Sequence, residues 1–60
     1  GDVANIEVVR TELAMARSLA LQDRRDEAVA MLREREALLA DELPEDDELR
    51  VQIAEAIAEL

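Results

Sequence analysis

Apolar residues recur at steps of three and four along the first third of the chain, with charged residues between them. The repeated positions are Ile6, Val9, Leu13, Ala16 and Ala20. This spacing places them on one face of an amphipathic helix, which Met15 and Leu19 widen. It predicts a helix over about residues 3–21, and we expect Asn5 or Asp2 to cap its first amides.

Charged residues interrupt the pattern in the stretch LQDRRDEAVAML, residues 21–32. Asp23 has the side chain of a helix cap, and a second aspartate three residues on favours the positive end of a new helix. We therefore expect a corner here, followed by a second helix over about residues 24–42. Because no glycine or proline forces the break, one continuous helix through Gln22 is the alternative.

The second predicted helix also has an apolar face. The residues expected to face the core are Ala28, Met31, Leu32, Leu38 and Leu39. Arg35 falls on the same stripe. We expect its alkyl stem to cover the edge of the core while the guanidinium group reaches water.

The stretch DELPEDDE, residues 41–48, marks a second corner. Pro44 disfavours helical geometry at the residue before it. Asp46 or Asp47 is suited to cap a third helix, expected over about residues 46–60. The prediction is an all-α fold in a single domain, residues 1–60: an antiparallel helical hairpin plus a third helix.

The third predicted helix carries more apolar surface than a small three-helix domain needs to bury. Its main face comprises Leu49, Ile53, Ala56, Ile57 and Leu60. A second strip comprises Val51, Ala54 and Ala58. The excess implies a neighbour, either another copy or the next unit of a longer protein. We therefore expect partner contacts at Ile53, Ile57 and Leu60.

The length and composition support the same expectation. A chain of 60 residues buries only about 60% of the surface of its unfolded form, so its stability is marginal. The chain has no cysteine and no histidine, which excludes disulfides and the usual zinc frameworks. Helix packing, self-association or a larger protein must supply the stability.

The net charge of −9 indicates which classes of partner the chain can bind. A strongly acidic surface repels the phosphates of nucleic acid and of anionic membranes, so we expect neither as a partner. A basic protein surface is the electrostatically favourable partner, or another copy of the chain in a homo-oligomer. No stretch resembles a signal peptide or a membrane span, and a cytoplasmic protein is expected.

The residue types argue against catalysis. The chain lacks His, Cys, Lys and Tyr, and no familiar pairing of nucleophile and base can be assembled from the rest. The acidic stretch 41–48 lacks the alternating ligand spacing and central glycine of a calcium loop. We expect no enzyme, no cofactor and no metal site.

The stretch MARSLALQDRRDEAVAML, residues 15–32, resembles the centre of a tetratricopeptide repeat. In that family small residues, here Ala16 and Ala28, let two helices of a hairpin approach closely. The third predicted helix can also be aligned on the first, as expected of stacked helical repeats. Three residues depart from the family pattern: Asp23 replaces the turn glycine, Glu12 a large apolar residue, and Arg35 a small one.

The resemblance implies a function as well as a fold. First helices line the ligand groove in this family, so Arg10, Leu13 and Arg17 are expected to contact an extended peptide. Alternatively Leu13 belongs to the core, and the arginines pair with Glu7 or face water. The expected function is a non-catalytic protein–protein interaction module that binds another protein or another copy. The alternative is a structural oligomerisation element, a coiled coil or helical bundle without a separate ligand.

Overall fold

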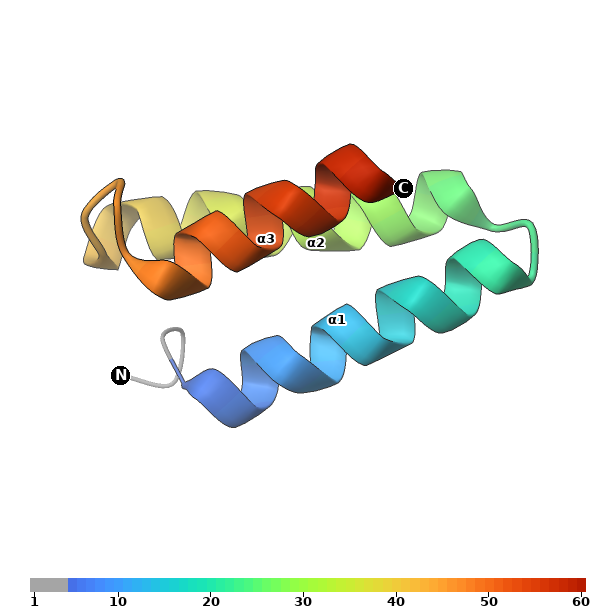
Figure 1. Cartoon of the computed structure of the whole chain (residues 1–60), viewed down its shortest axis with the longest axis horizontal. Helices are drawn as coiled ribbons and strands as arrows, with labels where there is room; N and C mark the ends of the chain where they lie inside the picture. Colours follow the sequence, from blue (N-terminus) through green and yellow to red (C-terminus); the bar gives the residue numbers. More distant parts are fainter. Residues whose placement is uncertain (1–4) are drawn as a thin grey trace.

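The computed structural model describes residues 5–60, and in that part of the chain all regular structure is helical. The helices are α1, Ile6–Leu21; α2, Arg25–Glu42; and α3, Glu48–Glu59 (Figure 1). The predicted all-α class is confirmed. None of these helices combines the length and the apolar character needed to cross a membrane.

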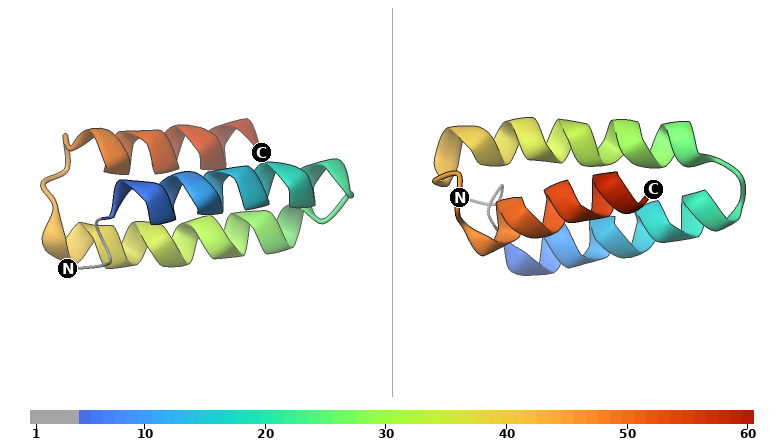
Figure 2. Two further views of the ribbon diagram at one scale, coloured as in Figure 1. Left: turned by 90° about the horizontal axis from the view of Figure 1, so that it is seen from below. Right: turned by 45° about the horizontal axis from the view of Figure 1, so that its top comes forward.

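The three helices form a small bundle. α1 and α2 make an antiparallel hairpin, and α3 runs back along α2 in the same direction as α1 (Figure 1). α3 packs most extensively on α2 and also touches α1, so it covers one side of the hairpin (Figure 2). The opposite side of the hairpin has no helix of the described chain over it.

The core lies where the three helices meet. Its buried residues are Val9, Leu13, Ala16, Ala28, Leu32, Leu39, Ile53 and Ala56. Ala16 and Ala28 are both fully or almost fully buried, and their small side chains allow α1 and α2 to approach closely. No polar or charged side chain of the described residues is buried. The bundle is therefore held together mainly by aliphatic packing.

Asn5 caps the start of α1. Its Oδ1 accepts hydrogen bonds from the backbone N–H groups of Glu7 at 2.8 Å and Val8 at 3.4 Å. These bonds satisfy two amides that have no partner within the helix. The alternative cap, Asp2, and the expected start near residue 3 lie outside the described residues.

The first corner is a true break, but Asp23 does not cap α2 as expected. It adopts a left-handed conformation with φ of 63°. Its N–H donates to the carbonyl of Ala20 at 3.1 Å, and the N–H of Arg24 donates to that of Leu19 at 2.8 Å. These two bonds close the C-terminus of α1 in a Schellman motif. Arg24 occupies the N-cap position of α2, but its side chain makes no capping hydrogen bond.

Glycine is the residue most often found in the left-handed conformation that Asp23 adopts after α1. Glycine takes positive φ without a steric penalty, and aspartate does so more readily than most residues. Asp23 therefore ends α1, whereas the sequence predicted that it would cap the start of α2.

The second corner follows the expectation more closely. Of the two candidate caps Asp47 is used, because its Oδ1 accepts the N–H of Leu49 at 2.9 Å. Arg50 reaches back from α3 and donates to the carbonyl of Leu43 at 3.0 Å. This bond ties α3 to the chain that leaves α2.

The expected core of α2 needs one correction. Leu38 is not buried but 41% exposed, because it lies on the side of the hairpin away from α3. Met31 is half-buried and packs against the core. Met15, expected to widen the apolar face of α1, is likewise 51% exposed.

Candidate interaction surfaces

Two of the residues expected to bind a partner belong to the core. Ile53 has no exposed surface and Leu13 only 8%. Both pack within this one chain, so Ile53 offers no surface to a partner and Leu13 very little. For Leu13 the alternative assignment, a core residue, is the one that the structure supports.

Ile57 and Leu60 are half-buried at the edge of the core. The main face of α3 is therefore largely covered by the hairpin. The second apolar strip of α3 remains in contact with solvent: Val51 is 40% exposed, and Ala54 and Ala58 are exposed as well. The apolar excess of α3 lies on this outer strip, away from Ile53.

Arg10 and Arg17 are exposed on α1, and neither takes part in an ion pair within the described part of the chain. Arg17 and Leu13 line a shallow cleft together with four residues of α3. Those residues are Gln52, Glu55, Ala56 and Glu59. Arg10 does not line this cleft, so the structure does not gather the three expected groove residues into one site.

The structure brings together Glu12 and Arg35, which are 23 positions apart in the sequence. The guanidinium Nε and Nη2 atoms of Arg35 donate to Oε1 and Oε2 of Glu12, both at 2.8 Å. The side chain of Arg35 is only 15% exposed and that of Glu12 only 21%. The hydrogen bond to this carboxylate raises the pKa of Arg35 above its ordinary value.

This ion pair corrects the expectation that the guanidinium group of Arg35 reaches freely into water. Glu12 and Arg35 lie on different helices, and only the packing of α1 on α2 brings them together. Nothing in the sequence around either residue indicates this contact.

A second surface lies beside this ion pair and was not expected. Glu7, Val8, Thr11, Glu12 and Met15 line a shallow groove along α1. Apolar residues at steps of three, four or seven from the ion pair continue this surface on both helices. We call them the open hairpin face: Val8, Met15 and Leu19 of α1, and Met31 and Leu38 of α2.

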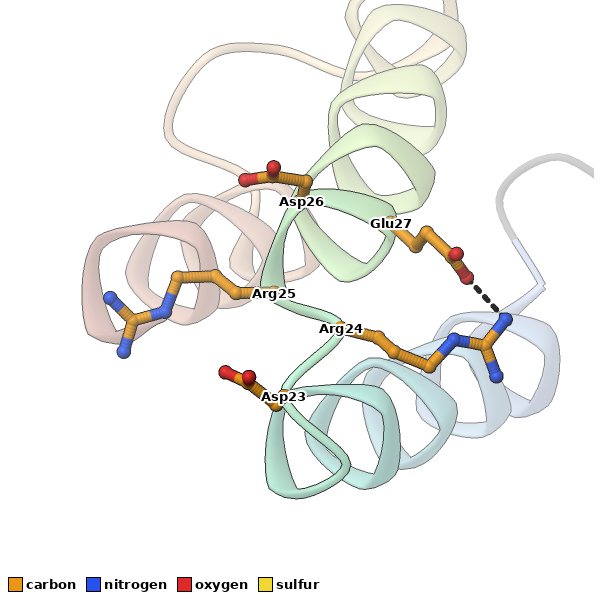
Figure 3. Close-up of a pocket in the computed structure, with 5 residues that line it drawn as sticks. All are labelled: Asp23, Arg24, Arg25, Asp26 and Glu27. Atoms are coloured by element: carbon orange, nitrogen blue, oxygen red, sulfur yellow. Dashed lines mark hydrogen bonds and ion pairs between the residues drawn. The ribbon is translucent and has the colours of Figure 1, made fainter.

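The first corner gathers five exposed charged residues (Figure 3): Asp23, Arg24, Arg25, Asp26 and Glu27. Arg24 forms an ion pair with Glu27, whereas Arg25 points to the opposite side of the chain (Figure 3). The two arginines therefore do not converge on a common point, and this corner does not form a clamp for a carboxylate or a phosphate.

Within residues 5–60, no group of three or more acidic side chains is arranged to hold a metal ion. In the acidic stretch 41–48, Asp47 serves as the cap of α3.

Comparison with known proteins adds no family: no protein-family model matches the chain, and no curated protein or solved structure matches it. The small helical fold and its uncovered apolar faces are therefore the features from which a function has to be inferred.

Proposed function

We propose that the chain is a non-catalytic protein–protein interaction module of helical-repeat type, similar to a tetratricopeptide repeat followed by one further helix. It binds another protein, or another copy of itself, through apolar surface that its own three helices leave uncovered.

One observation carries the proposal. Several large apolar side chains remain exposed: Met15 by 51% and Leu38 by 41% on the open hairpin face, and Val51 by 40% on α3. Ile6 and Leu21, at the two ends of α1, are exposed by 47% and 89%. None of these side chains is among the buried residues of the core. Apolar side chains grouped on a face of so small a protein are typical of surfaces that meet a partner.

The helical-repeat character is supported by the hairpin. Ala16 and Ala28, the small residues of the family pattern, are buried between α1 and α2, and Leu32 is buried beside them. The two charged departures, Glu12 and Arg35, neutralise each other and leave the hairpin intact. A stack of such hairpins buries the outer face of each unit against the next.

A specific feature favours the alternative, a structural oligomerisation element. The outer strip of α3 combines Val51 with two alanines, Ala54 and Ala58, and small residues allow a helix of a second copy to approach closely. The charge of −9 on each copy opposes this association, and most strongly at low salt.

Two measurements test the proposal. Sedimentation equilibrium over a wide range of protein concentration detects self-association. Selection from a library of random peptides displayed on phage, with the immobilised chain as bait, detects a preference for a foreign partner. The proposal expects a concentration-dependent increase in mass, an enriched peptide motif, or both. A chain that stays monomeric and enriches no motif contradicts it.

A further inference from the structure

We propose that the open hairpin face binds an amphipathic helix of another protein, one whose apolar stripe is flanked by arginine or lysine. This inference rests on the proposed function and names the surface and the class of partner.

The shape of the face favours a helical occupant. The face lies between two antiparallel helices, and its apolar side chains form one stripe on each: Val8, Met15 and Leu19 on α1, and Met31 and Leu38 on α2. The side-chain ridges of a third helix can pack into the grooves between the side-chain rows of such a face. α3 already occupies the other side of this hairpin in this way.

The charges around the face favour a basic occupant. The arginines on this side of α2, Arg24 and Arg35, are bound to Glu27 and Glu12. Each of these two pairs is neutral and presents no net positive charge to a ligand.

Other carboxylates at the rim remain without an ion pair in the described part of the chain. Glu7 lines the groove on α1. Glu34 and Asp41 lie one helical turn before and after Leu38, on the same side of α2. Glu34 also interacts electrostatically with Arg35, so its charge is partly offset. The apolar stripe is nevertheless bordered by an excess of negative charge, which attracts lysine or arginine next to the apolar residues of a partner.

The same charges disfavour a second copy at this face. The exposed apolar strip of α3 is the natural candidate for contact between copies, but α3 carries Glu48, Glu55 and Glu59 against a single arginine. Bringing it onto a rim of carboxylates places like charges together. A foreign basic helix meets the opposite sign.

The experiment uses a synthetic peptide of 18 residues, as long as α2, with leucines on one helical face and arginines beside them. A matched peptide carries glutamate in place of every arginine. Each is titrated into the isotope-labelled chain and followed by NMR, and the dissociation constant is measured by calorimetry. We expect the arginine peptide to bind more tightly by a factor of ten or more, and more weakly as salt is added.

The amide shifts should centre on Val8, Met15 and Leu38. Leu38→Gln should raise the dissociation constant by about tenfold, because it removes apolar contact without adding charge. Leu21→Gln is the control: Leu21 is 89% exposed, but it lies at the C-terminal end of α1 and outside the open hairpin face, so its replacement should leave affinity unchanged.

A second variant tests the electrostatic argument alone. Glu34→Gln combined with Asp41→Asn keeps the apolar stripe and removes two rim charges. We expect it to weaken binding of the arginine peptide and to flatten the dependence on salt. Circular dichroism shows whether each variant keeps its helix content.

Several outcomes would overturn the inference: no binding of the arginine peptide, equal binding of both peptides, or equal losses with Leu38→Gln and Leu21→Gln. A mass that doubles and returns to that of one chain with Leu38→Gln would assign the face to a second copy. If phage selection enriches a motif that is not a basic helix, this inference fails while the interaction function stands.

Discussion

The two sides of the α1/α2 hairpin differ in how they are covered. On one side α3 packs over Leu13 and Leu39 and removes them from solvent. On the other side Met15 and Leu38 stay exposed, and the middle of the surface is occupied by the ion pair between Glu12 and Arg35. One side of the hairpin is thus covered by α3, whereas apolar residues on the other side stay exposed to solvent.

The largest expected difference between the sides is in stability. Leu39 and Leu38 are neighbours on α2, the first fully buried and the second largely exposed. Leu39→Ala should lower the free energy of unfolding by about 2–5 kcal/mol, because it leaves a cavity in the core. Leu38→Ala should change it by about 0.5 kcal/mol or less. Urea unfolding followed by circular dichroism measures both, and similar losses would contradict the distinction.

The ion pair tests the open side directly. Glu12→Gln removes the charge that binds a partly buried guanidinium group, so we expect a loss of about 1–2 kcal/mol. The double variant Glu12→Leu with Arg35→Ala restores the apolar and small residues of the repeat pattern and should recover most of that loss. Thermal unfolding of the single and double variants provides the comparison. A double variant as unstable as Glu12→Gln would mean that the pair is needed for folding.

On the side of the hairpin that α3 covers, the burial of Leu13 and Leu39 depends on how stable α3 is. Asp47→Ala removes the side-chain cap at the start of α3 and should cost about 1 kcal/mol. Hydrogen exchange should show the loss first in the amides of α3, while α1 and α2 keep more of their protection. An equal loss of protection from hydrogen exchange in all three helices would indicate that the hairpin does not stay folded unless α3 packs on it.

The smallest expected effect is at the corner that joins the two sides. Asp23→Gly places glycine at a position with positive φ and should raise the free energy of unfolding by about 0.5–1 kcal/mol. Because the corner lies at the end of the hairpin, we expect no change in the affinity of the arginine peptide. A gain in stability accompanied by altered affinity would contradict the separation of corner and binding face.

The sequence predicted the elements of this fold well because local rules govern them. The spacing of apolar residues identified three helices, and short polar side chains identified Asn5 and Asp47 among the candidate caps. These features depend on residues only a few positions apart.

Features that depend on distant residues were missed. Leu38 fits the apolar periodicity as well as Leu39 does, and only the position of α3 decides which of them is covered. The ion pair between Glu12 and Arg35 joins two helices, and neither residue signals the other. The partner-binding surface was assigned to Ile53 for the same reason, since periodicity shows that a face is apolar but not what lies over it.

The ion pair between Glu12 and Arg35 also bears on how uniquely the helices are aligned. Aliphatic contacts tolerate small changes in side-chain packing, whereas a two-pronged contact between fixed atoms is satisfied in one alignment only. A hairpin without this pair can keep its free energy of unfolding and still exchange among several side-chain packings. Such an ensemble would broaden the NMR resonances of α1 and α2, so a chain can stay equally stable while losing a single native structure.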